Sequence, residues 1–549
     1  MKHTKKMGKL LTSVLLTSAF AVSALAGCGS KAAKTADAKI EDGAVATTTA
    51  DTSIVANEVS LPLCEEKTTL SMYIPLDANM ATVISDYNEN KFFQELEKRT
   101  NVHIDFQCPA VGEEVTAYNL MIASNELPDI ICHNGYHYSD GLDAAVEDGY
   151  YLDLTPYLDT LLSNYNKLRL KNDFFAKSTV TDEGRVVAIY QIFSDPQPPY
   201  KGLEIRKDWL DDLGLDVPVT FDDWEKMLQA FKDEKGAYAP LSIGALGYNM
   251  DSNSMSAGYN VLNGFMNVDG TVKFGPIEDG WRKYLTKMND WYSKGLIDPD
   301  FMTGGGYTPD MSIITSGQCG AWDSMYTMPA LYESSTDDKN MQIIPVASPV
   351  EKEGDEVHVR LADSIIHAYC TISADSENAE LAMKWLDYMC SPEGSLLCNY
   401  GIEGETFEYN ADGVPEYSDL VCKNPDGLSF AQAMTYYTLP PSLIGGDYDW
   451  KRELSSVPEE DVLSMEVWGA VPDDYNMPAG ISYTSDEAKE LGEIVNSVNT
   501  YLTEKTSQFI TGVADINTEW DQYMSDIKAM NIDRAIEINQ AALDRFNNR

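Results

Sequence analysis

One short segment carries aromatic and acidic residues of the kind that bind polyhydroxylated ligands. Residues 317–326, Gly-Gln-Cys-Gly-Ala-Trp-Asp-Ser-Met-Tyr, are typical of a short strand flanked by glycines and followed by an aromatic and polar loop. Trp322 and Tyr326 could stack on the flat face of a carbohydrate, and the Asp323 carboxylate could accept hydrogen bonds from hydroxyl groups. We therefore predict that these three residues contact a ligand.

Two tyrosines in another loop are candidates for the same role. Tyr136 and Tyr138 lie in residues 133–138, directly after the apolar segment 129–132, which is typical of a strand buried in a parallel sheet. Open α/β sheets hold ligands at the carboxyl ends of their strands. Both tyrosines are therefore expected either to line a binding site or to pack against the protein's own surface.

Three further residues are weaker candidates. Tyr248 and Asn249 follow the apolar stretch 241–246 and are predicted to line the other wall of the site. Glu403 lies in the turn 401–404, where its carboxylate could bond a ligand hydroxyl or could equally cap a neighbouring helix.

No metal, cofactor or catalytic residue is predicted. His133 and His137 have the spacing of a metal pair on a helix, but Gly135 lies between them and no third ligand is evident. The sequence contains no CxxC pair, no GxSxG nucleophile motif, no HExxH zinc helix and no phosphate-binding loop. A binding protein is therefore favoured over an enzyme.

The predicted elements that position these residues alternate between strands and helices. Strands are predicted at 69–74, 102–106 and 129–132, and helices at 91–100, 117–123, 219–232, 281–294, 377–390, 485–503, 517–530 and 532–546. Gly214 is expected to end one helix as its C-cap, and Ser485 or Asp486 is expected to begin another as its N-cap. This alternation indicates a layered α/β fold.

The composition bounds the size and the partners of the protein. The chain has 549 residues, of which 87 are acidic and 40 are basic, and its net charge is -47 at pH 7. A chain of this length builds two or three domains or two large lobes. Nucleic-acid binding is disfavoured, because such a negative surface repels phosphate backbones.

The N-terminus predicts export and anchoring. Four lysines in the first nine residues precede an uncharged run at 10–26, which is too short for a comfortable membrane span and is typical of a signal peptide. Leu25-Ala26-Gly27-Cys28 resembles the lipobox of bacterial lipoproteins, in which the cysteine is diacylated and becomes the new N-terminus. An isolated cysteine placed there by chance is the alternative. We predict a signal peptide at 1–27, and acylated Cys28 with a flexible tether at 28–60.

The other cysteines do not form a compact framework. They are widely and irregularly spaced, at Cys64, Cys108, Cys132, Cys319, Cys370, Cys390, Cys398 and Cys422. Most are expected to be small buried hydrophobic residues, and one or two disulfides stay open as an alternative.

Several stretches together resemble a known family, the extracellular solute-binding proteins of family 1, which are substrate-binding lipoproteins of ABC importers. Each stretch alone is weak, but the ordered set covers most of residues 68–410. The matching stretches are 96–102, 119–131, 147–157, 205–215, 291–301 and 400–406.

The resemblance implies a type II periplasmic-binding-protein fold, in which two α/β lobes joined by crossing segments close on a ligand. It implies a lobe 1 of residues 61–190 plus about 365–440, and a lobe 2 of about 191–364 plus about 441–549. The implied ligand is a sugar or oligosaccharide, the implied partners are ABC permease subunits in the membrane, and the implied state is a monomer on the extracellular face.

Three other functions are alternatives to oligosaccharide capture. A peptide or another small solute would also suit an aromatic and polar cleft. A surface glycoside hydrolase would need two carboxylates about 5 to 10 Å apart across a cleft. An adhesion module would show the strand spacing of a β-sandwich. Relatives that bind acidic polysaccharide carry a calcium loop where this chain has residues 232–240, which lack the alternating oxygen ligands of calcium.

Overall fold

The computed structural model describes residues 59–77, 79–243, 253–303, 310–359, 364–441, 443–472 and 475–549. The predicted signal peptide, Cys28, Tyr248 and Asn249 lie outside these ranges. Within them, no helix combines the length and the apolar composition needed to span a bilayer.

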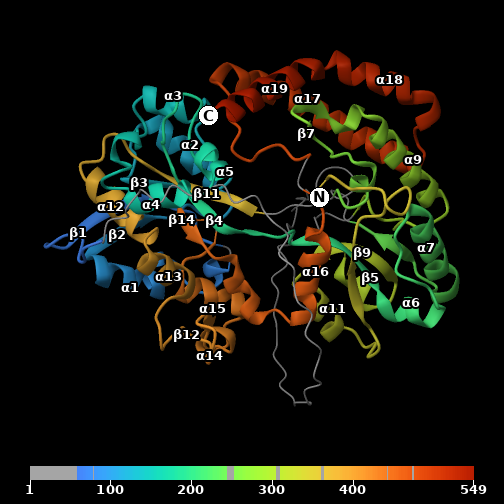
Figure 1. Ribbon diagram of the computed structural model, residues 1–549, viewed down its shortest axis with the longest axis horizontal. Coiled ribbons are helices and arrows are strands. Elements are labelled where there is room, and N and C mark those ends of the chain that lie inside the picture. The colour runs from blue at the N-terminus through green and yellow to red at the C-terminus, as the bar shows by residue number, and fades with distance from the viewer. Residues whose placement is uncertain are drawn as a thin grey trace, which may run out of the picture. The chain divides into compact units, whose positions relative to one another are not determined.

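A six-stranded sheet, called here the first sheet, has the strand order β14-β4-β11-β3-β1-β2 (Figure 1). Its strands are β1 (Thr68–Tyr73), β2 (Val102–Gln107), β3 (Ile130–His133), β4 (Ile189–Gln197), β11 (Ser364–Ile372) and β14 (Gly446–Tyr448). β1 pairs in parallel with β2 and β3, whereas β11 runs antiparallel to β3 and β4. All four residues of β3 are buried, in agreement with the apolar segment that predicted this strand.

Helices and a small hairpin accompany the first sheet. They are α1 (Lys91–Thr100), α2 (Glu114–Ser124), α3 (Gly141–Glu147), α4 (Ser163–Arg169), α5 (Asp173–Ser178), α12 (Ala379–Met389), α13 (Pro392–Tyr400), α14 (Asp419–Cys422), α15 (Phe430–Tyr437), and the pair β12 (Phe407–Tyr409) and β13 (Pro415–Tyr417). The apolar faces of α1 and α12 pack into one core with the sheet, through side chains that include Phe92, Leu96 and Trp385.

A four-stranded sheet, called here the second sheet, has the order β10-β5-β9-β6 and its own core. Its strands are β5 (Lys201–Arg206), β6 (Ala239–Ser242), β9 (Cys319–Met325) and β10 (Ile343–Val346), and a hairpin joins β7 (Phe265–Val268) to β8 (Thr271–Phe274). The accompanying helices are α6 (Lys207–Leu213), α7 (Phe221–Lys235), α9 (Asp279–Ser293), α10 (Met311–Thr315), α11 (Pro329–Ser335) and α16 (Glu459–Gly469). Trp224, Trp281 and Trp291 are buried in this core.

Three long helices follow near the end of the chain: α17 (Ser485–Thr511), α18 (Ile516–Ala529) and α19 (Ile532–Asn548). They share the core of the second sheet, and α17 also packs on α9. Short 3-10 helices span Met80–Thr82, Tyr87–Glu89, Thr155–Tyr157, Ser256–Tyr259, Gly275–Ile277 and Trp450–Ser456.

The helix ends confirm one predicted cap and correct another. Gly214 ends α6 in the left-handed conformation, as predicted, with φ 64°. The N-cap of α17, however, is Thr484 and neither Ser485 nor Asp486. The Thr484 hydroxyl accepts from the Glu487 backbone N–H, while the Glu487 carboxylate accepts from the Thr484 N–H, which satisfies two donors at the helix start.

The chain passes between the two sheets in several places. The first passage is the short link from β4 to β5, the second lies between β10 and β11, and the third follows β14, after which α16 packs on β5 and β10. β4 belongs to the first sheet as far as Gln197, and β14 belongs to it as well, so the first and third passages lie later in the chain than the expected lobe boundaries near 190 and 440.

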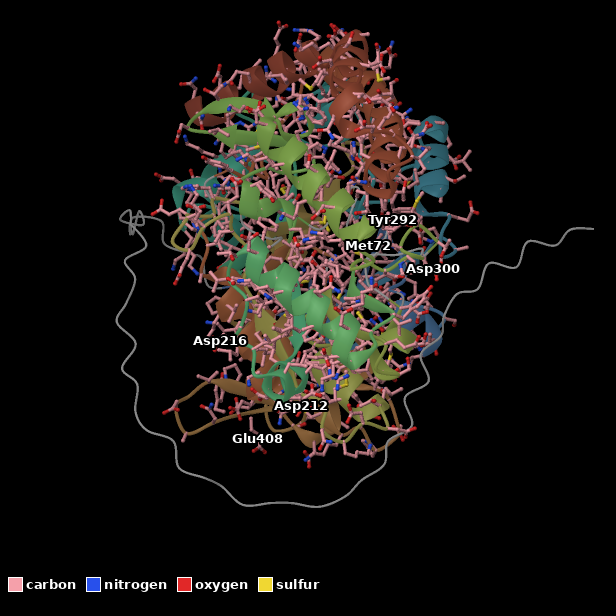
Figure 2. The ribbon with its side chains drawn as sticks, turned by 90° about the vertical axis from the view of Figure 1, so that its right-hand side faces the viewer. Met72, Asp212, Asp216, Tyr292, Asp300 and Glu408 are labelled. Atoms are coloured by element: carbon pink, nitrogen blue, oxygen red, sulfur yellow. The ribbon has the colours of Figure 1, made fainter. Side chains whose placement is uncertain are left out.

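The negative charge of the chain is displayed at the surface. Asp212 in the last turn of α6, Asp216 just after this helix and Glu408 on β12 are exposed (Figure 2). This distribution favours solubility and disfavours binding to polyanions.

Candidate functional site

A cavity of about 620 Å³ lies between elements of the first sheet and the C-terminal helices. One wall comes from the residues after β3, from α3 and from the segment before β4. The other wall comes from residues 479–485 and from the end of α19. Small-molecule sites range from about 300 to 1,000 Å³, so this cavity is large enough for a small-molecule ligand.

Three tyrosines line the cavity on the side of the first sheet. Tyr190 of β4 and Tyr369 of β11 stand opposite each other in the antiparallel register, with ring centroids 5.2 Å apart, and Tyr138 comes from the loop after β3. Each is half-buried, and the Tyr138 hydroxyl donates to Asp148 over 2.6 Å. Tyrosine rings that border a cavity can stack on sugar rings.

The buried His133 ring packs against one face of the Tyr369 ring. The two rings are stacked, with centroids 4.5 Å apart and planes at 15°. His133 Nδ1 lies 3.2 Å from the Tyr136 carbonyl oxygen, which can only accept, so this nitrogen carries the proton. Nε2 then accepts from the Thr371 hydroxyl over 3.0 Å. Burial lowers the pKa of His133 to about 3, so the imidazole is neutral at physiological pH.

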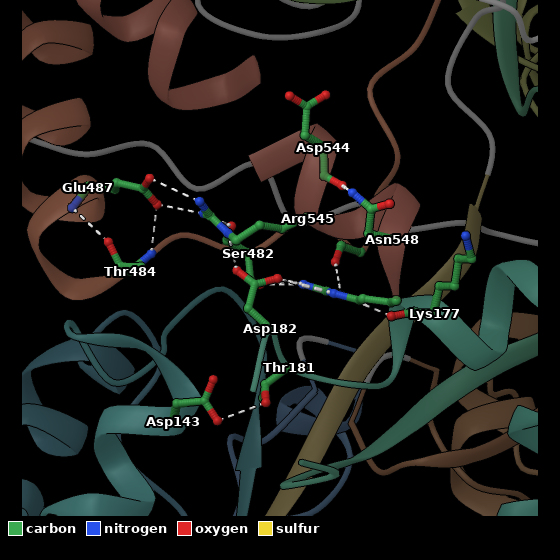
Figure 3. Close-up of polar contacts among 12 residues, drawn as sticks. Asp143, Lys177, Thr181, Asp182, Ser482, Thr484, Glu487, Asp544, Arg545 and Asn548 are labelled. Carbon is green, nitrogen blue, oxygen red and sulfur yellow. Dashed lines mark hydrogen bonds and ion pairs between the residues drawn. The ribbon is translucent and has the colours of Figure 1, made fainter. Parts of the chain in front are cut away.

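The opposite wall is built on Arg545 of α19 and on Arg549, which directly follows this helix. Both bind Asp182 of the first-sheet side, and Figure 3 shows Arg545 beside this aspartate. Arg545 Nε donates to one carboxylate oxygen of Asp182 over 2.6 Å, and Arg549 Nη2 donates to the other over 2.6 Å. Arg545 also makes a bidentate pair with Glu487, at 3.0 and 2.6 Å. Burial raises the pKa of Asp182, but the hydrogen bonds from Arg549 and Arg545 outweigh it and hold the pKa below its usual value.

The structure places the first three predicted ligand contacts in the protein interior. Trp322 is 0% exposed, and its Nε1 donates to Glu204 over 2.7 Å. Asp323 is buried, pairs with Lys201 over 3.1 Å and accepts a hydrogen bond from the Ser254 hydroxyl. Tyr326 is buried in an aromatic cluster and donates to Glu453 over 3.4 Å. In this conformation the Trp322 indole offers no exposed face to a sugar ring.

The other predicted residues are divided between interior, cavity and surface. Tyr136 is buried and donates to the Cys132 carbonyl over 2.5 Å, whereas Tyr138 lines the cavity. Glu403 is exposed beside β12 and is not among the residues that line the cavity. The structure therefore brings one of these described candidates, Tyr138, to the cavity.

Several cavity residues were not predicted from the sequence. Tyr190 and Tyr369 lie on strands that the sequence patterns did not identify, and their pairing joins residues that are far apart in the chain. Arg545 and Arg549 are four residues apart, which puts them on one face of a helix, and this spacing is the signal that could have drawn attention to them.

Potential metal ligands are dispersed over the residues that the structure describes. Within that part of the chain, no group of three or more His, Cys, Asp or Glu side chains is arranged to hold a metal ion. Residues 232–235 continue helix α7, and Gly236 caps it in the left-handed conformation. The eight cysteines of the described ranges carry free thiols.

Comparison with known proteins identifies the family of the chain. The family model for bacterial extracellular solute-binding proteins matches residues 82–395, which is more than half of the chain. The fructooligosaccharide ABC transporter substrate-binding protein FusA of Streptococcus pneumoniae is 25% identical, over 97% of this chain and 98% of FusA.

Solved structures show the same fold. A solute-binding protein of Bifidobacterium longum infantis, described as binding HMO, superimposes with a TM-score of 0.71 at 19% identity, over 87% of this chain and 99% of that one. The alginate-binding protein AlgQ2 superimposes with a TM-score of 0.69 at 19% identity, over 88% of this chain and 99% of that one. The predicted α/β fold of this class is confirmed, and the chain belongs to the bacterial extracellular solute-binding proteins.

Proposed function

We propose that the protein captures an oligosaccharide in the cavity and presents it to the permease subunits of an ABC importer. The observation that carries the proposal is the cavity itself, which combines tyrosine rings and carboxylates on the first-sheet wall with two arginines on the opposite wall. Aromatic faces and convergent polar groups are the usual means of binding sugars. The similarity to FusA over almost the whole length of both chains supports the same ligand class.

Capture works by closure of two lobes, each built on one of the two sheets. Each sheet has its own hydrophobic core, and the cavity has walls from both sides. A ligand that touches both walls binds the closed form more tightly than the open form and shifts the population towards it. Small-angle scattering tests this step, because the radius of gyration should fall when the ligand saturates the protein. An unchanged radius would count against closure.

Binding without turnover distinguishes this role from that of a glycoside hydrolase. We expect calorimetry to show saturable, one-to-one binding of an oligosaccharide such as kestose to a monomer, and chromatography of the incubated sugar to show no shorter products. Release of such products would identify an enzyme instead. A screen that finds peptide ligands only would favour the second candidate, a peptide-binding member of the same fold.

The ligand contacts proposed here are Tyr138, Tyr190 and Tyr369, together with polar groups of the cavity wall. Tyr248 and Asn249 stay candidates for contacts from the second-sheet side. Trp322, Asp323 and Tyr326 support the second sheet and its neighbours through their buried hydrogen bonds.

Lipid anchoring through Cys28 completes the proposal. Two acyl chains hold a protein on a membrane far better than one, and a tether keeps the binding domain close to the permease. We expect Cys28→Ser to release the protein from the membrane fraction without changing the ligand affinity of the binding domain. Retention of this variant in membranes would contradict a lipid anchor at Cys28.

A further inference from the structure

We infer that the cavity selects neutral glycans and rejects glycans built from uronic acids. The inference rests on the proposed function and concerns the ligand class of the same cavity. The evidence is the set of charged groups on the cavity wall. A site for an acidic sugar must offer a cationic side chain that can bind the sugar carboxylate in place of its present partner in the protein.

The donors of Arg549 are fully engaged by the protein. Its Nε and Nη2 donate to Asp182 Oδ1 over 3.2 and 2.6 Å. Its Nη1 donates to the backbone carbonyl oxygens of Lys177 and Gly480 over 2.9 and 2.8 Å, and Nη2 also donates to the Ser482 hydroxyl. A guanidinium has five N–H donors, and these contacts use all of them.

Arg545 is engaged in a similar way. It bonds Asp182 through Nε, Glu487 through both terminal nitrogens and the Ser482 carbonyl oxygen through Nη2 over 3.1 Å. Figure 3 shows Arg545 between Glu487 and Asp182. A sugar carboxylate could bind either arginine only by displacing Asp182 or Glu487, which would leave a partly buried charge without its partner.

Carboxylates outnumber cations on the described wall. The acidic side chains that line the cavity are Asp140, Asp143, Glu147, Asp182 and Glu183. The nearby Arg185 pairs with Asp143 over 3.1 Å and with Glu183 over 2.9 Å, so it too is engaged. The wall therefore repels an anionic ligand, whereas the carboxylate oxygens can accept hydrogen bonds from the hydroxyl groups of a neutral sugar.

Two matched sets of sugars test the inference by calorimetry on the intact protein. The neutral set contains kestose and other uncharged trisaccharides, and the acidic set contains trigalacturonate and an alginate trimer. We expect the wild-type protein to bind at least one neutral sugar, and to bind every acidic sugar about tenfold or more weaker than that sugar.

Asp182→Asn sharpens the test. The amide keeps the shape of the side chain but removes the charge that holds Arg545 and Arg549, so the affinity for trigalacturonate should rise about tenfold and should fall again with added salt. The control is Glu490→Gln, which in the same way releases Arg534 of α19 from a bidentate pair at 3.0 to 3.1 Å, on a residue that does not line the cavity. This control should not change the affinity for either set.

The outcomes separate the inference from the proposed function. Wild-type binding of acidic sugars as tight as that of neutral ones would overturn the inference and leave oligosaccharide capture standing. Binding of neither set would overturn the proposed function and the inference with it. If folded Asp182→Asn, verified by its circular dichroism spectrum, gains no affinity for trigalacturonate, the assignment of selectivity to the Asp182 pairs is wrong.

Discussion

The His133 imidazole lies against one face of the Tyr369 phenol ring, with the two centroids 4.5 Å apart. His133 is 1% exposed, whereas Tyr369 is half-buried and lines the cavity. The buried ring therefore supports a ring that we propose as a ligand contact. Nδ1 is hydrogen-bonded to the Tyr136 carbonyl oxygen and Nε2 to the Thr371 hydroxyl, so the imidazole has a fixed orientation. The stacked contact in turn fixes the plane of the Tyr369 ring.

Tyr369→Ala should weaken oligosaccharide binding. Loss of a stacked ring costs about 1 kcal/mol, which corresponds to about a fivefold rise in the dissociation constant measured by calorimetry. Tyr369→Phe keeps the ring and should keep most of the affinity. Tyr409→Ala is the control, because Tyr409 is an exposed tyrosine on β12 outside the cavity lining. Equal loss of affinity in the control variant would show that the effect is not local.

His133 should make the protein less stable in mild acid. Its pKa is about 3 in the folded protein and about 6.5 in the unfolded chain, so between these values the unfolded chain binds more protons. The free energy of unfolding therefore falls as the pH falls from 6.5 towards 3, by roughly 1 kcal/mol per pH unit from this residue. His133→Gln should reduce that slope in urea unfolding. An unchanged slope would mean that folded His133 accepts a proton near its ordinary pKa.

Asp387 should act in the opposite direction. It is buried on α12, where it accepts from Asn164 Nδ2 over 2.7 Å and from the Tyr165 backbone N–H over 2.9 Å, and burial raises its pKa to about 6 from 3.8. The folded protein binds the extra proton between these values, so this contribution to stability is complete below pH 3.8 and is lost as the pH rises through 6.

The variant Asp387→Asn removes this titration. Its unfolding free energy should depend on pH more steeply than that of the wild type between pH 4 and 6, because the opposing contribution is gone. His133→Gln serves as the matched comparison, because the two variants should change the pH dependence of the unfolding free energy in opposite directions. A change in the same direction would contradict one of the two assignments.

Local patterns in the sequence were enough to predict much of the scaffold. The apolar segment at Asp129–Cys132 became β3, and the helical periods at 91–100 and 281–294 became α1 and α9. The sequence signals of these elements are local, because they come from side chains within one or two helical turns or from one short run of residues. The same holds for Gly214, whose place after an apolar face fixes it as a cap.

The cavity depended on contacts between distant parts of the chain. Tyr190 and Tyr369 meet because β4 pairs with β11, and Asp182 meets Arg545 because the end of α19 returns to the first-sheet side. No local pattern encodes either pairing. In β9, six of seven residues are buried, so the strand lacks the alternation that would distinguish an inward indole at Trp322 from an exposed one.

Trp322→Ala should therefore affect stability and not ligand binding. The indole is fully buried, packs edge to face on Tyr332 and donates to the buried Glu204, so its removal creates a cavity and takes a donor from a buried carboxylate. We expect a loss of about 3 to 5 kcal/mol in the free energy of unfolding, measured in urea. Trp322→Phe is the matched variant, because it keeps an aromatic ring but lacks the N–H, and it should cost about 1 to 3 kcal/mol. Both variants should bind oligosaccharide with wild-type affinity at temperatures where they are folded. Unchanged stability with weakened binding would instead make Trp322 a ligand contact, as its place in the sequence first indicated.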